Sequence, residues 1–196
     1  VATMAGAGIY AYFSDTETSS GNVFTAGVMD LDKPADAVIA INNAYPGYTS
    51  PIYKVDVSMN TRTNIKPDHM EIDIDTYNFT DSSVESGGVN TADDFKKQIE
   101  IKKLTWHYDK KSVDLLEMVN DSADGKDGFI SLYDVEAHGP FRPLPAIGKT
   151  GTGRLEVQFA MPTDLPAEND NLFQGDSISI TFEFAIAQEA GQQVLS

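Results

Sequence analysis

Short runs in which apolar and polar residues alternate are the feature of this sequence that most restricts its fold. The longest run covers residues 177–187, and its apolar face consists of Ile178, Ile180, Phe182, Phe184 and Ile186. Similar alternation occurs at 53–59, 70–75, 99–106 and 155–159. A period of two is typical of a strand with one buried face. Because glycine- and proline-containing turns separate the runs, the pattern predicts an all-β sandwich or jelly roll.

Helical signals are sparse along the chain. Residues 112–119 combine an N-cap serine with apolar spacing of three and four, and residues 91–98 carry two aspartates near their start. We therefore expect a short helix in each of these segments. The span 107–150 holds the first helix, an acidic loop and a proline-rich stretch, and we interpret it as an insertion on the β framework. No linker separates a second domain.

The balance of charges excludes several kinds of partner. The chain of 196 residues has 30 Asp and Glu against 14 Lys and Arg, which gives a formal net charge of −16. Such a surface repels nucleic acid and anionic membranes, so we expect neither as a partner. No apolar run is long enough to span a bilayer as a helix. The absence of cysteine excludes disulfides and thiolate metal sites.

The first fourteen residues contain no charged side chain, in contrast to the acidic remainder. Both alternating faces of this segment are small or apolar, so a strand here would be covered on both sides. It can enter the sheet of its own chain or that of a neighbour, or it can be a frayed tail. The first residue is valine, and the small, uncharged start favours removal of a signal peptide over truncation. We therefore expect a secreted or cell-surface protein.

Two longer motifs go beyond periodicity. Residues 12–27 read YFSDTETSSGNVFTAG and are followed by MDLD at 29–32. Residues 171–180 read NLFQGDSISI and are followed by FEF at 182–184 and QEAG at 188–191. Both motifs resemble those of the TasA/camelysin family of secreted proteins, and together they cover about a fifth of the chain.

The resemblance implies a secreted jelly-roll protein that polymerises into an extracellular filament, pilus or tubule. It further implies donor-strand exchange, in which residues 1–13 fill a groove in the next subunit and residues 14–196 form the jelly-roll domain. The donor residues that we expect to make the contacts are Val1, Met4, Ala5, Ala7, Ile9, Tyr10, Tyr12 and Phe13. A strand supplied in this way satisfies an unpaired sheet edge and fills an apolar groove. Because the contact is head-to-tail between identical subunits, it propagates into a homopolymer.

The family resemblance also brings a metallopeptidase activity into consideration. The motif H-E-x-x-H, which places two histidines on zinc with a glutamate as base, is absent. The three histidines, His69, His107 and His138, are far apart in sequence. There is also no cysteine nucleophile, no G-x-S-x-G and no phosphate-binding glycine loop. We therefore expect no enzymatic activity, and a secreted peptidase of the camelysin type remains the alternative.

Calcium is the cofactor that the sequence favours. Residues 121–136 resemble an EF-hand loop, but Ala123 and Gly125 occupy positions where carboxylates belong. A looser oxygen cage and a solvated acidic loop both remain open. The ligands that we expect for the cage are Asp121, Asp124, Asp127 and Asp134. Divalent ions would relieve the repulsion between subunits of charge −16, so we expect Ca²⁺ to promote assembly.

Two further expectations concern surface residues. The carboxylates of Glu71, Asp73 and Asp75 share one face of a strand, and we expect that face to be solvated. Tyr45, Tyr48 and Tyr53 lie close together in sequence and offer a second alternative function. In that alternative the chain is a monomeric, calcium-stabilised β-sandwich that binds carbohydrate on a tyrosine platform.

Overall fold

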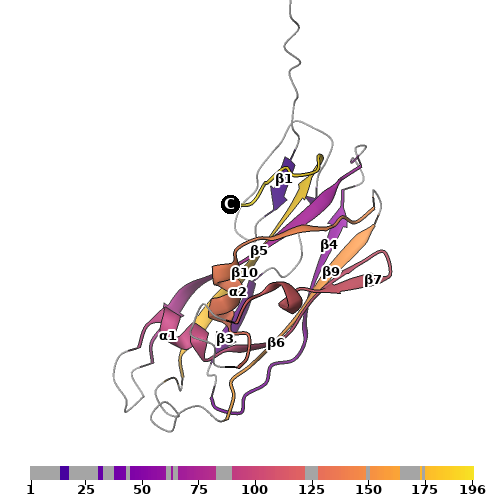
Figure 1. Ribbon diagram of the computed structural model, residues 1–196. Coiled ribbons are helices and arrows are strands. Elements are labelled where there is room, and N and C mark those ends of the chain that lie inside the picture. The colour runs from indigo at the N-terminus through magenta and orange to yellow at the C-terminus, as the bar shows by residue number, and fades with distance from the viewer. Residues whose placement is uncertain are drawn as a thin grey trace, which may run out of the picture.

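The computed structural model describes residues 14–17, 31–32, 38–42, 45–60, 63, 66–82, 90–121, 128–148, 151–163, 173 and 175–196. Two antiparallel sheets account for most of them (Figure 1). The first sheet contains β1 (Ser14–Glu17), β3 (Val38–Asn42), β5 (His69–Thr80), β8 (Phe141–Pro145) and β10 (Ser177–Ala187). The second contains β2 (Leu31–Asp32), β4 (Tyr53–Met59), β6 (Glu100–Tyr108), β7 (Lys111–Asp114) and β9 (Thr152–Ala160).

The order of the strands is that of a jelly roll. Leaving out the edge strands β2 and β3, eight strands remain, and they pair in a nested way along the chain. The first pairs with the last (β1 with β10), and inside them lie the pairs β4–β9, β5–β8 and β6–β7. Contacts between β10 and β5 and between β9 and β6 then complete the two sheets. The predicted all-β sandwich is therefore confirmed.

The alternating runs form strands because their apolar faces meet between the sheets. On β10, the side chains of Ile178, Ile180, Phe182, Phe184 and Ile186 are all buried. Opposite them, Trp106 of β6 lies with its ring centroid 6.3 Å from that of Phe184. The indole N–H of Trp106 donates to the carbonyl of Pro145 at 3.0 Å, so its one polar atom is satisfied inside the core.

The helices are short and differ in part from the prediction. The expected helix at 91–98 is present as α1 (Ala92–Lys97), with Thr91 and Asp94 forming a capping box at its start. The helix predicted at 112–119 is wrong for its first half, since Lys111–Asp114 form β7, and only η1 (Leu116–Met118), a 3₁₀ turn, remains. Asp109 and Lys110, both at positive φ, turn the chain tightly from β6 into β7.

A second helix, α2 (Leu132–His138), begins inside the acidic segment and packs against β5, where Glu136 accepts the backbone N–H of Thr76. The span 107–150, interpreted above as an insertion, includes the framework strands β7 and β8 together with η1 and α2. Figure 1 shows β1 and the C-terminus at one end of the sandwich and α1 at the opposite end. Among the residues described, no helix is long and apolar enough to cross a membrane.

Candidate functional site

An open groove lies along one side of the sandwich, between β3 and the first part of β4, which β2 does not cover. It has a volume of about 340 Å³ and is lined by Val38, Ile39 and Ala40 of β3 and by Tyr53, Lys54 and Val55 of β4. Strand β3 pairs only with β10, and β2 covers β4 only at Ser58 and Met59 within the described ranges. Among the residues that the structure describes, the two strand edges that line the groove therefore have no ladder partner there.

The groove combines two properties that an extended segment can satisfy. Unpaired backbone N–H and C=O groups along β3 and β4 can form a ladder with an added strand. Apolar side chains line it together with Lys54, with Ile39 and Val55 buried and Val38 41% exposed. Residues 38–42 were not predicted as a strand, although the β-branched run Val-Ile-Ala-Ile is a signal for one.

The donor residues predicted from the sequence, Val1 to Phe13, lie outside the described residues, and their assignment stays a prediction. The structure does place the backbone immediately after them. Ser14 opens β1 as the ladder partner of Ala187, at the end of β10 where the C-terminus lies. The groove lies further along the same edge of β10, because β3 pairs with β10 residues 177–181.

The four aspartates predicted to bind metal lie in different surroundings. Asp124 and Asp127 lie outside the described part of the chain. Asp121 is half-buried, and its Oδ1 is buried without a hydrogen-bond partner in the described structure. Asp134 is buried and caps α2, because its Oδ2 accepts the Ser131 N–H at 3.0 Å and the Ser131 hydroxyl at 2.8 Å. One oxygen of Asp134 is therefore already engaged by the helix cap.

The expectation that Glu71, Asp73 and Asp75 share a solvated face is wrong for the first two. Glu71 is fully buried and Asp73 is 9% exposed, whereas Asp75 is exposed. The reason is tertiary: the backbone N–H groups of Val194 and Leu195 donate to the Glu71 carboxylate, at 2.7 Å for Leu195. The C-terminal segment thus covers the end of this strand face. Burial, with the nearby charge of Asp75, raises the pKa of Asp73.

The histidines do not form a metal centre. His69 is buried on β5 with its two ring nitrogens 3.0 Å from Asp68 and 3.4 Å from Glu71. His107 belongs to β6 in the other sheet, and His138 stacks on Phe141 at the end of α2. Within the described ranges no group of three or more His, Asp or Glu side chains is suited to hold a metal ion. These residues therefore do not fit the zinc centre of a peptidase.

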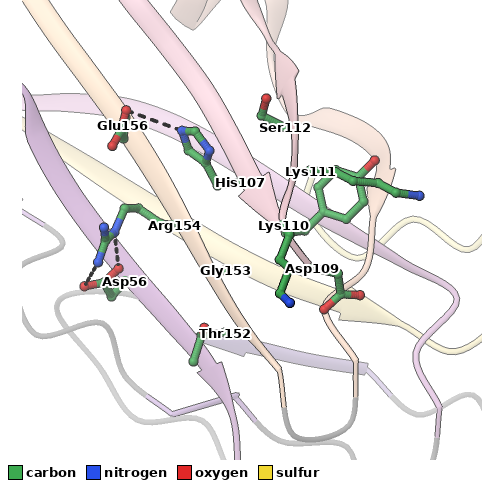
Figure 2. Close-up of a pocket in the computed structure, with 11 residues that line it drawn as sticks. Asp56, His107, Asp109, Lys110, Lys111, Ser112, Thr152, Gly153, Arg154 and Glu156 are labelled. Carbon is green, nitrogen blue, oxygen red and sulfur yellow. Dashed lines mark hydrogen bonds and ion pairs between the residues drawn. The ribbon is translucent and has the colours of Figure 1, made fainter.

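A second, polar hollow of about 430 Å³ lies on the outer face of the second sheet (Figure 2). Its charged groups are largely paired with one another. Arg154 donates to both oxygens of Asp56, at 2.5 and 3.1 Å, and lowers the pKa of that carboxyl. His107 lies 3.3 Å from Glu156, whose pKa is lowered mainly by a hydrogen bond from Lys103. This pattern is typical of cross-strand pairs on a solvated sheet.

The three tyrosines considered for carbohydrate binding do not form a flat platform. Tyr45 is 56% exposed, but its ring meets that of Tyr48 edge-on, at an interplanar angle of 66°. Tyr53 packs against the core, 6.2 Å from Phe159 between ring centroids. A sugar-binding platform needs several exposed, coplanar rings, so this alternative gains no support from the geometry.

The comparison with protein families identifies the relatives of the chain. A family model described as camelysin metallo-endopeptidase matches residues 1–193. Because the match spans almost the entire sequence, the chain belongs to the TasA/camelysin family. The comparison with curated proteins returns no match.

Proposed function

We propose that this chain is a structural subunit of an extracellular filament, pilus or tubule, that it polymerises by donor-strand complementation, and that Ca²⁺ promotes the assembly. The open groove between β3 and β4 is the observation that carries the proposal. It offers an unpaired backbone edge and an apolar lining to one extended segment. The uncharged residues 1–13 have the composition that such a groove accepts.

The direction of β1 supports donation to a neighbour rather than to the same subunit. Strand β1 starts beside Ala187 and runs toward Phe184, and therefore toward the groove beside β3. Positions 187 and 181 of β10 are about 20 Å apart along a strand. Ser14 thus opens β1 at the end of the sheet far from the groove, and a preceding donor segment would have to reverse direction to reach the groove of its own subunit.

Charge supports the role of calcium. Filament packing brings subunits of charge −16 together, and hard divalent cations can bridge carboxylates between or within them. The buried, unpartnered Oδ1 of Asp121 is the one described ligand of the acidic loop that is open to such an ion. Asp134 contributes at most its remaining oxygen, because the α2 cap uses the other.

The test of donor-strand exchange removes and then restores the donor. A variant that lacks residues 1–11 is expected to keep its circular dichroism spectrum and melting temperature but to form no filaments by electron microscopy. A peptide of residues 1–13 should bind this variant and, in excess, block assembly of the full chain. Filaments formed by the truncated variant, or a peptide that does not bind it, would refute the proposal.

The groove itself is tested by a matched pair of substitutions. Val38 and Ile52 are exposed to similar extents, 41% and 43%, but only Val38 lines the groove. Val38→Asp should slow assembly by about ten-fold or more, because a buried, unpaired charge costs more than 1.4 kcal/mol. Ile52→Asp should assemble at close to the wild-type rate. Equal rates for the two variants in light scattering would contradict the assignment of the acceptor groove.

The family description makes a peptidase the second candidate. The separated positions of the three histidines argue against a zinc centre built from them. Incubation of the purified chain with a casein substrate, with and without added Zn²⁺, decides between the two. We expect no cleavage above that of a control preparation; Zn²⁺-dependent cleavage abolished by chelator would favour the peptidase.

A further inference from the structure

Two aspartates lie at opposite positions of neighbouring strands, at the end of the first sheet away from the C-terminus. Asp81 directly follows β5, and Asp176 directly precedes β10. Their neighbours Thr80 and Ser177 are ladder partners, so the aspartates are opposite one another one step beyond the last pair. The Ser82 N–H donates to Asp176 Oδ1 at 2.8 Å, which turns the Asp176 carboxylate toward the segment that carries Asp81.

Both carboxylates are left with an unsatisfied oxygen. Asp176 is 0% exposed, and its Oδ2 is buried without a hydrogen-bond partner among the described residues. The Oδ1 atom of Asp81 is likewise buried without a hydrogen-bond partner among the described residues. No ion pair in the described structure involves either side chain. The adjoining sequence segments 83–89 and 164–174 contain no lysine or arginine, so they supply no compensating charge.

The surroundings make this arrangement costly without a cation. The rings of Phe79 on β5, Phe95 on α1 and Phe173 pack in series, tilted to one another, with centroids 5.8 and 6.1 Å apart. The Asp176 N–H donates to the Phe173 carbonyl at 3.3 Å, which places Asp176 next to this series. An apolar neighbourhood excludes water and strengthens electrostatic interactions. A buried carboxylate therefore needs a positive partner, and two adjacent carboxylates need it more.

We infer that Asp81 and Asp176 hold a divalent cation of the Ca²⁺ type inside each subunit. All available donors are oxygens, which Ca²⁺ prefers over softer metals, and Ca²⁺ accepts irregular geometry with carbonyl and water ligands added. The ion ties the end of β5 to the start of β10. This site is separate from the acidic loop at 121–134 and does not depend on the filament proposal.

The test measures Ca²⁺ binding to the full chain after treatment with chelator. Isothermal titration calorimetry gives the number of ions bound and their affinity, thermal unfolding gives the shift in Tm, and light scattering recorded in parallel separates binding from assembly. We expect the wild type to gain several degrees in Tm with Ca²⁺. Asp81→Asn and Asp176→Asn should each lose one bound ion, or about ten-fold or more in its affinity, together with that gain in Tm.

Two controls keep the result specific. Asp75→Asn removes an exposed carboxylate from β5 and should retain the ion at this site. In chelator, Asp176→Asn should melt at or above the wild-type temperature, because the amide keeps the acceptor for Ser82 and removes one of two like charges. Unchanged Ca²⁺ binding in Asp81→Asn and Asp176→Asn would overturn the inference. A marked drop in their Tm in chelator would also overturn it, because the carboxylates would then be stabilised without a cation.

Discussion

At the scale of single residues, burial overrides the sequence pattern on the outer face of β5. In the alternating pattern of β5, Glu71 occupies a position that is expected to face solvent. It is nevertheless fully buried and accepts hydrogen bonds from the backbone N–H groups of Val194 and Leu195. Arg142 of β8 approaches the same carboxylate at 3.5 Å and also contacts the Leu195 carbonyl. One carboxylate therefore fastens the C-terminal segment to the sheet.

Replacing Glu71 should test this role. Glu71→Ala leaves two backbone N–H groups without their acceptor and removes one of the two partners of the Arg142 guanidinium, and we expect a loss of about 2–5 kcal/mol in the free energy of unfolding. Asp75→Ala, an exposed position on the same strand, should change that free energy by no more than about 0.5 kcal/mol. Urea unfolding measures both, and similar losses in the two variants would contradict the role assigned to Glu71.

A pH dependence follows from the pair Asp73 and Glu183, which are direct ladder partners on β5 and β10. Burial and then neighbouring carboxylates raise the pKa of both groups. Between the unfolded pKa and the raised folded pKa, the folded state binds more protons than the unfolded state. The free energy of unfolding therefore falls as pH rises through this window.

Glu183→Gln removes the repulsion between the carboxylates of Glu183 and Asp73. We expect it to stabilise the fold at pH 7 by about 0.2–1 kcal/mol, the range for a cross-strand pair. The gain should vanish below about pH 4, where the wild-type carboxyl is protonated in both states. Urea unfolding at several pH values provides the measurement, with the exposed Glu117→Gln as control. A gain that is independent of pH would show that charge is not the cause.

At the scale of elements, close packing between strands depends on one glycine. Gly153 of β9 lies beside the ring of Trp106 on β6. The ladder partners of Gly153 are Val57 on β4 and Tyr108 on β6. A Cβ at Gly153 would lie only 2.1 Å from Trp106 Cη2 and 2.9 Å from Ile147 Cγ2. Both strands would therefore have to shift, or the indole would have to leave its position.

Gly153→Ala should for this reason cost about 1–3 kcal/mol, the usual range for overpacking a core. Gly148→Ala is the control, because the nearest atom to its new Cβ lies 4.0 Å away. The chain has one tryptophan, so its fluorescence reports directly on the Trp106 environment. An unchanged emission spectrum and Tm in Gly153→Ala would contradict the packing described.

Helix α2 illustrates how tertiary contacts position an element. Glu136 on this helix accepts the N–H and the hydroxyl of Thr76 on β5 and pairs with Lys96 on α1. The helix begins at a capping box formed by Ser131 and Asp134. The sequence shows this box as S-x-x-D, but the acidic residues around it favoured the prediction of an ion-binding loop.

At the scale of the whole molecule, net charge opposes assembly. Each proposed donor-strand contact brings two bodies of charge −16 together, and salt screens that repulsion, with a Debye length of about 8 Å at physiological ionic strength. Monovalent salt should therefore accelerate assembly gradually, whereas a bridging divalent ion should act at much lower concentration.

Light scattering of the full chain tests this difference. We expect millimolar Ca²⁺ to accelerate assembly more than the same ionic strength of NaCl, and chelator to reverse the Ca²⁺ effect alone. The variant that lacks residues 1–11 should assemble neither with Ca²⁺ nor with NaCl. Filaments that form equally fast in chelator and in Ca²⁺ would refute the role of calcium while leaving donor-strand exchange intact.

The sequence by itself determined the long alternating strands and the core face of each, although it did not predict β3 or β7. Alternation at 53–59 and 177–187 predicts β4 and β10 with their bounds, because period-two burial is a local property that the chain shows directly. The motifs at the two ends predicted the family that the comparison confirms. The acidic composition likewise defines the charge that any assembly must overcome.

Only the tertiary structure decided which strands become neighbours and what covers them. Asp81 and Asp176 are 95 positions apart and meet only through the register of β5 with β10. Glu71 is buried because the chain returns to it at Val194 and Leu195, and the groove lies where, among the described residues, β3 and the first part of β4 in two different sheets have no further strand partner. Such contacts join residues distant in sequence, so no local pattern of residue types encodes them.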